Sequence, residues 1–115
     1  VENNTNFRRV LKTNLQDLFP SMVIHEAAEG NEALQRVDTF RPELIFMDIG
    51  LPGENGLQLT QRIKTSYPDT KVIILTSHDT LEYREAAIRC GANCFITKAS
   101  LNWEQLETLV KSLFK

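Results

Sequence analysis

Three polar side chains stand where apolar runs of the sequence end. Asp48 follows Leu-Ile-Phe-Met, Thr76 follows Val-Ile-Ile-Leu, and Lys98 follows Phe-Ile-Thr. A carboxylate nucleophile, a hydroxyl and a fixed cation are the groups that phosphoryl transfer to a carboxylate requires. Taken singly, each is more often an ordinary solvated strand end, so the prediction rests on all three occurring at equivalent positions.

Two further oxygen donors lie at the start of the chain. Glu2 and Asn3 precede the first predicted helix, and the loop that contains them is expected to lie near Asp48. Mg²⁺ binds oxygen ligands and needs only one or two carboxylates beside phosphate oxygens. These residues therefore favour Mg²⁺-assisted phosphoryl transfer.

Other nucleotide and metal chemistries have little support in the sequence. It contains no phosphate-binding Gly-x-x-x-x-Gly-Lys-Ser/Thr, no Gly-x-Gly-x-x-Gly after a strand, and no Gly-x-Ser-x-Gly. Cys90 and Cys94 have no histidine nearby, which predicts two small buried thiols rather than a metal site. His25 and His78 likewise have no partner in the sequence that would complete a metal site.

Short apolar runs alternate along the chain with segments of helical periodicity. The runs are 22–27, 44–47, 72–75 and 94–96, and the helical segments are 7–18, 30–37, 59–63, 83–90 and 103–113. Apolar runs without polar alternation predict a parallel sheet covered by helices on both faces. Since the carboxyl ends of parallel strands share one edge, where ligands bind, the polar residues that follow the strands should converge there.

The first predicted helix begins almost at once, with Asn3, Asn4 or Thr5 as its N-cap. Its apolar stripe includes Phe7 and Val10. In a doubly wound fold this helix should follow a strand. Either the sheet has one strand fewer, or Val1 is the last residue of a strand that mostly precedes the sequence, and the second alternative is favoured because Val1 is a natural strand end.

Composition limits the classes of function. The 115 residues are 42% hydrophobic and 24% charged with a net charge of −2, which predicts one globular domain without a basic surface for direct nucleic-acid binding. No apolar stretch is long enough to cross a membrane and no signal peptide is evident, so a cytoplasmic location is expected.

The ordered motifs resemble the receiver domain of two-component response regulators. They are Val1-Glu2-Asn3-Asn4, Phe46-Met-Asp-Ile-Gly-Leu-Pro-Gly-Glu-Asn-Gly56, Leu75-Thr-Ser77 and Thr97-Lys98. The resemblance implies the α/β doubly wound, flavodoxin-like fold of chemotaxis regulators, with a five-stranded parallel sheet of order 2-1-3-4-5. It covers residues 1–115 as one receiver domain with no output domain in this chain.

The resemblance also implies a role for individual residues. Asp48 corresponds to the phospho-acceptor, Lys98 to the cation that pairs with the phosphoryl group, Thr76 to the switch hydroxyl and Phe95 to the switch aromatic. The implied Mg²⁺ ligands are Glu2, Asn3, Asp48 and the backbone carbonyl of Gly50. The implied activity is Mg²⁺-dependent self-phosphorylation and self-dephosphorylation rather than conventional enzyme turnover.

The implied partners are a sensor histidine kinase or phosphotransfer protein and an output domain or partner protein, most simply one that regulates transcription. A homodimer through the last two helices and the strand between them is also implied. No contact of this domain with nucleic acid or membrane is expected.

Two residues depart from the family pattern. Asn3 stands where receivers usually have a second acid, so weaker Mg²⁺ binding is expected. Ala99 stands where proline is common, which predicts a trans peptide bond after Lys98.

The alternative hypothesis is a degenerate receiver that binds proteins without phosphorylation. An aspartyl-phosphate hydrolase is disfavoured because Gly50 occupies the position of its second aspartate.

Overall fold

A computed structural model describes residues 1–114. Its elements are α1 (Thr5–Leu18), α2 (Gly30–Phe40), β1 (Leu44–Met47), α3 (Gly56–Ser66), β2 (Lys71–Thr76), α4 (Leu81–Arg89), β3 (Cys94–Thr97), the 3₁₀ turn η1 (Lys98–Ser100) and α5 (Trp103–Leu113). The three strands are parallel and lie in the order β1-β2-β3. No helix within residues 1–114 is long and apolar enough to cross a membrane.

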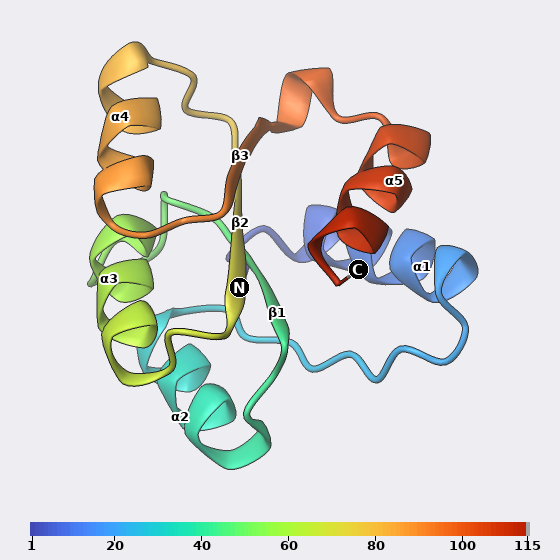
Figure 1. Cartoon of the computed structure of the whole chain (residues 1–115), viewed down its shortest axis with the longest axis horizontal. Coiled ribbons are helices and arrows are strands. Elements are labelled where there is room, and N and C mark those ends of the chain that lie inside the picture. The colour runs from blue at the N-terminus through green and yellow to red at the C-terminus, as the bar shows by residue number, and fades with distance from the viewer. Residues whose placement is uncertain (115) are drawn as a thin grey trace.

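Helices cover both faces of the sheet, as the unbroken apolar runs predict. Figure 1 shows α2, α3 and α4 on one side of the strands and α1 and α5 on the other. Along β2, Val72 and Ile74 pack into the core on the α2–α4 side, whereas Ile73 and Leu75 pack into the core beneath α1 and α5. Burial on both faces holds the strands in position, and because the strands are parallel, their carboxyl ends lie at the same edge of the sheet.

The starts of the helices are capped by side chains, which sets where each loop of the site ends. Asn4 accepts from the backbone N–H of Phe7 at the start of α1, and Asn55, Thr80 and Asn102 cap α3, α4 and α5 in the same way. Asn4 is one of the three N-caps that the sequence allows. The prediction that Val10 is part of the buried stripe is wrong, because its side chain is 48% exposed.

Residues 22–27 do not form the strand that their apolar character predicts. Apart from a turn bond between Met22 and Phe19, their described backbone pairing is one bond, from the Glu2 N–H to the Ala27 carbonyl at 2.9 Å. On the other side, the Val1 amine donates to the Phe46 carbonyl at 2.5 Å and the Asp48 N–H donates to the Val1 carbonyl at 3.1 Å. Val1 and Glu2 therefore lie between β1 and residues 22–27, and two residues are too few to form a ladder with both.

An apolar groove lies next to Val1, between residues 22–27 and β1. Its volume is about 960 Å³. Leu11, Leu15, Ile24, Val37 and Ile45 are among the residues that line it. The groove therefore separates residues 22–27 from β1 except at Val1 and Glu2.

Candidate functional site

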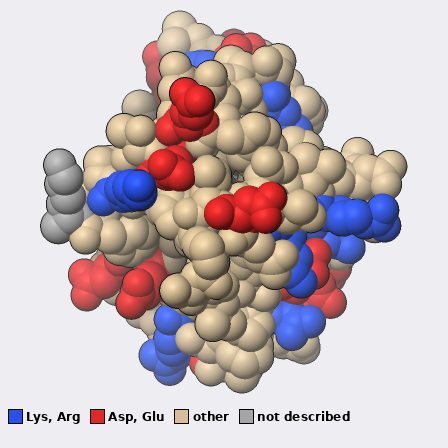
Figure 2. Space-filling view, turned by 90° about the vertical axis from the view of Figure 1, so that its right-hand side faces the viewer, with Lys and Arg blue, Asp and Glu red and all other residues tan. Residues whose placement is uncertain are grey.

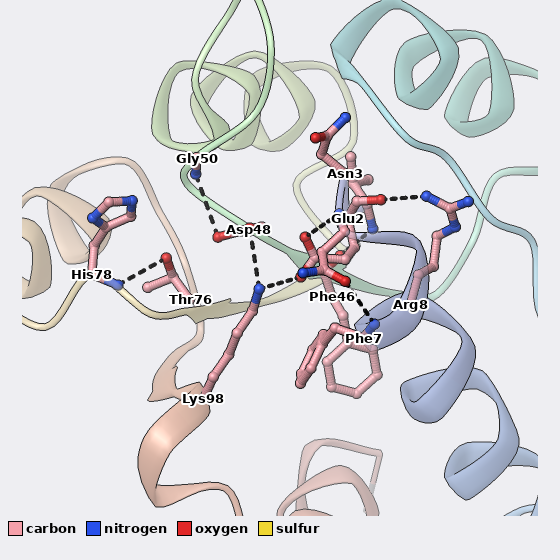
Figure 3. A network of polar contacts seen from close by, with 12 residues as sticks. Glu2, Asn3, Phe7, Arg8, Phe46, Asp48, Gly50, Thr76, His78 and Lys98 are labelled. Atoms are coloured by element: carbon pink, nitrogen blue, oxygen red, sulfur yellow. Dashed lines mark hydrogen bonds and ion pairs between the residues drawn. The ribbon is translucent and has the colours of Figure 1, made fainter.

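The three polar residues that follow the strands lie together at one edge of the sheet. Asp48 follows β1, Thr76 is the last residue of β2, and Lys98 follows β3. The Lys98 ammonium lies 3.4 Å from Asp48 Oδ2, and Figure 3 shows Thr76 on the neighbouring strand. The convergence predicted from the strand ends is thus present in the fold.

The turn after Asp48 is held tightly against the start of α3. The Gly56 N–H donates to the Ile49 carbonyl at 3.0 Å, and a Cβ at Gly56 would lie 1.9 Å from the Asp48 carbonyl oxygen. Only glycine fits there without displacing the backbone that carries the acid. The Pro-Gly-rich stretch thereby positions Asp48.

Two buried carboxylates share one ammonium group. Glu2 is 4% and Asp48 8% exposed, and Lys98 forms ion pairs with both. Glu2 Oε2 accepts a hydrogen bond from the Asn4 N–H at 3.1 Å. Glu2 Oε1 contacts Lys98 as an ion pair without hydrogen-bond alignment, and among the described residues it has no hydrogen-bond donor.

The surroundings of Asp48 favour its anion. Burial alone raises the pKa of its carboxyl, but hydrogen bonds from the Thr76 hydroxyl and the Gly50 N–H and the charge of Lys98 outweigh burial, so the pKa is lowered. Asp48 is therefore ionised at neutral pH, which is the form that a nucleophile requires.

The oxygen donors at this edge fit Mg²⁺. Within residues 1–114, no group of three or more His, Cys, Asp and Glu side chains could hold a metal ion. Mg²⁺ keeps several waters and needs only one or two protein carboxylates. Glu2 Oε1, which is buried and accepts no hydrogen bond, and the adjacent Asp48 carboxylate provide such a pair.

Asn3 is not drawn into this cluster. Its side chain is exposed, its amide nitrogen lies 3.4 Å from the Ala28 carbonyl, and Figure 3 shows the amide directed away from Asp48. Its role as a cation ligand stays a prediction.

We expect Asn3→Asp to tighten Mg²⁺ binding roughly tenfold, because a charged ligand beside Glu2 replaces a neutral amide. Calorimetric titration with MgCl₂ measures the affinity. Asn6→Asp, which adds the same charge at an exposed position in the first turn of α1, is the control. Equal affinities in the two variants would show that residue 3 does not contact the cation.

Gly50 and His78 lie side by side at the mouth of the site. The Gly50 N–H approaches Asp48 Oδ1 at 3.4 Å, and the His78 N–H donates to Thr76 Oγ1 at 3.3 Å. A Cβ at Gly50 would lie 3.2 Å from His78 Nε2, so the absence of a side chain at position 50 leaves room for the imidazole. The assignment of the Gly50 carbonyl as a Mg²⁺ ligand stays a prediction.

Phe95 lies partly buried on β3 under an arginine that sequence reasoning missed. The guanidinium of Arg84, on α4, lies 4.8 Å from the ring centroid, and Asp79 holds Arg84 through a 2.8 Å ion pair. Arg84 is eleven positions before Phe95 in the sequence, and no local motif indicated the contact. The sequence does not indicate the contact of Phe7 with Lys98 either, because the spacing of Phe7 predicts only a place in the apolar stripe of α1.

A doubly wound parallel sheet with Asp, Thr and Lys at its carboxyl edge defines a receiver domain of the kind found in response regulators. The sequence profile of the response regulator receiver domain matches residues 1–111. The chain belongs to this family.

Relatives of known sequence and structure agree with this assignment. The oxygen regulatory protein NreC of Staphylococcus carnosus is 39% identical over 112 residues, covering 96% of this chain and 49% of that protein. The same protein of Staphylococcus haemolyticus is 40% identical over 94 residues, covering 81% of this chain and 43% of that protein. The chain thus spans about half the length of these relatives.

Solved structures show the same fold. The receiver domain of a DNA-binding response regulator from Colwellia psychrerythraea superimposes with a TM-score of 0.92 at 27% identity, covering 98% of this chain and 93% of that one. A LuxR-family DNA-binding response regulator from Staphylococcus aureus gives a TM-score of 0.91 at 20% identity, covering 100% and 95%. At that identity the second likeness shows the fold alone.

Proposed function

We propose that this receiver accepts a phosphoryl group on Asp48 from a sensor histidine kinase or phosphotransfer protein and then changes its surface to control an output. The observation that supports it best is the buried Asp48 carboxylate, with a lowered pKa, 3.4 Å from the Lys98 ammonium. The output is the regulation of transcription, which is supported by the similarity to DNA-binding response regulators.

The chemistry follows from the positions of the side chains. An Asp48 oxygen attacks the phosphorus of the donor, the bond to the donor's imidazole nitrogen or acyl oxygen breaks, and the leaving group keeps the electron pair. The Lys98 ammonium then pairs with a phosphoryl oxygen, and the Thr76 hydroxyl donates to another. Glu2 and Asp48, with Asn3 and the Gly50 carbonyl, would hold Mg²⁺, which when bound neutralises charge on the phosphoryl oxygens.

The switch would pass from Thr76 to Phe95. Movement of the Thr76 hydroxyl toward a phosphoryl group vacates space beside the end of β3, and the Phe95 ring changes its burial in response. The ring now lies beneath Arg84, so the change in burial would alter the surface between α4 and α5.

The surface that we propose for output or homodimer contacts consists of α4, β3 and α5. Leu81 and Ile88 are 70% and 73% exposed and lie seven residues apart on α4, so they share one side of the helix. Contact with nucleic acid is not proposed for this domain. On the side of the molecule that carries α1 and α5, Figure 2 shows acidic and basic side chains interspersed within a largely uncharged surface.

We further propose that residues 1–115 form one receiver domain of the cytoplasm with the five-stranded order 2-1-3-4-5. Residues 22–27 would be the edge strand, Val1 and Glu2 the end of the strand next to it, and β1, β2 and β3 the remaining three. The backbone bonds of Val1 and Glu2 to both neighbours support this order.

Mass spectrometry after incubation with MgCl₂ and acetyl phosphate tests the proposal. We expect a single phosphoryl increment in the unaltered chain and none in Asp48→Asn. Asp69→Asn, which neutralises an exposed loop acid, should keep the increment. No increment in the unaltered chain would contradict phosphorylation and favour the phosphorylation-independent binding module, for which the outward-directed amide of Asn3 is the supporting observation.

A further inference from the structure

The ring of Phe7 lies directly beside the ammonium group of Lys98. Lys98 Nζ is 4.4 Å from the centroid of the ring, within the range of an attractive cation–π contact. Figure 3 shows Phe7 on α1 next to Lys98, which also contacts Asp48 and Glu2. The ammonium thus has three partners: two carboxylates and one aromatic face.

Two of these three partners belong to one short, well-connected segment. The Asn4 N–H holds Glu2 Oε2 at 3.1 Å, and Asn4 Oδ1 accepts from the Phe7 N–H at 3.0 Å. Arg8 Nη1 donates to the Glu2 carbonyl at 2.7 Å. The first turn of α1 therefore places the Glu2 carboxylate and the Phe7 ring relative to each other through bonds that do not involve Lys98.

An aromatic face suits this position for a physical reason. The lysine side chain is long and flexible, and holding it in one conformation costs entropy. A third carboxylate would compete with Asp48 for the ammonium, whereas water would leave it mobile. The face of a phenyl ring attracts the cation, excludes water from that side, and leaves the N–H groups available to oxygen acceptors.

We propose that Phe7 is a positioning residue, which keeps the Lys98 ammonium between Glu2 and Asp48 so that it is in place when a phosphoryl group arrives. The contact itself is independent of phosphorylation, and its effect on rate rests on the proposed function. Phe7 makes no contact with the reacting atoms and acts only through Lys98.

Nuclear magnetic resonance detects the contact directly, because a ring face shifts the nearby Lys98 ε-methylene protons upfield. The variants are Phe7→Leu, which keeps an apolar side chain without the ring, and Phe7→Tyr, which restores an aromatic face. Phe19→Leu is the matched control, since Phe19 is a partly buried phenylalanine of the same core. We expect the upfield shift in the unaltered chain, Phe7→Tyr and Phe19→Leu, and its loss in Phe7→Leu.

The rate of phosphorylation by acetyl phosphate is measured on the same four proteins. We expect Phe7→Leu to be slower by about three- to tenfold, the range that a cation–π contact corresponds to, and Phe7→Tyr to recover most of the rate. The positioning role would be overturned if the Lys98 ε-methylene protons of the unaltered chain showed no upfield shift. It would also be overturned if Phe7→Leu and Phe19→Leu slowed phosphorylation equally. If the Lys98 ε-methylene protons are shifted upfield but the chain accepts no phosphoryl group, the result would contradict the proposed function and still support the contact between Phe7 and Lys98.

Discussion

Lys98→Ala is expected to slow phosphoryl uptake on Asp48 by about a hundredfold or more, the usual effect of removing one preorganised group that stabilises developing charge. Lys98 is the cation that lies 3.4 Å from Asp48, and its side chain is only 19% exposed, so water cannot fully replace it. Initial rates with acetyl phosphate at fixed MgCl₂ measure the effect.

The same substitution should also change how stability depends on pH. In the unaltered chain the lowered pKa of Asp48 means that its ionisation adds stability above the ordinary pKa of an aspartate. That stability is lost as the pH falls through the lower, folded value. Without Lys98, two buried carboxylates face each other uncompensated, so the variant should be least stable relative to the unaltered chain near neutral pH and should approach it in acid.

The control is Lys111→Ala, which removes an ammonium paired with Glu107 at the surface, where the lysine is 62% exposed. It should alter neither the rate nor the pH profile, since exposed pairs contribute little. Comparable rates for the two variants would contradict the role proposed for Lys98. If the difference in the free energy of unfolding between Lys98→Ala and the unaltered chain did not change with pH, this would contradict the interpretation that Glu2 and Asp48 share the charge of Lys98.

In a protein that consists of residues 1–115 alone, adding four or five apolar, β-branched residues ahead of Val1 is expected to raise the free energy of unfolding by about 2–5 kcal/mol. Such a segment would fill the groove of about 960 Å³ between residues 22–27 and β1. Burial of two or three apolar side chains gives about 1.5–3 kcal/mol each, and the backbone hydrogen bonds that the added strand forms with both neighbours, at about 1 kcal/mol each, offset most of the cost of ordering its backbone. Chemical denaturation measures the gain.

The buried amine of Val1 makes this gain depend on pH. Burial lowers its pKa from 8.0 to about 6, so the folded chain releases a proton that the unfolded chain keeps between those values. Stability therefore rises with pH over that range, and the cost of the buried charge is fully present below about pH 6. An amide at this position has no such charge, so the gain should be larger below pH 6 than above pH 8.

A Gly-Ser extension of equal length is the control, because it removes the charge without filling the groove. The Gly-Ser extension should raise the free energy of unfolding only by the amount that comes from removing the buried charge of the Val1 amine, and this amount depends on pH. Slowed amide exchange in residues 22–27 should accompany the apolar extension alone, as these residues acquire a partner strand. Equal stability of the two extensions would contradict the groove as a strand position and, with it, the five-stranded order.

Much of the fold follows from local patterns. The strands at 44–47 and 94–97 lie where the apolar runs predict them, and α1 begins after Asn4, α2 begins at Gly30 and α4 ends before Gly91, as the caps and glycines predict. Gly91, with a φ of 94°, ends α4 in the left-handed conformation expected after a helix. The prediction of a strand at 22–27 was wrong, because a strand needs a neighbouring strand with which to pair, and no local pattern can supply one.

For the candidate site, the sequence by itself determined the residue types at the strand ends and the reason for their convergence: parallel strands with two buried faces end at one edge. Only the tertiary structure decided which side chains touch. Glu2 and Asp48 share Lys98, the amide of Asn3 turns toward Ala28, and Phe7 lies against Lys98. The physical reason is that strand periodicity fixes which edge a residue reaches. The direction of a side chain depends instead on partners that are distant in the sequence.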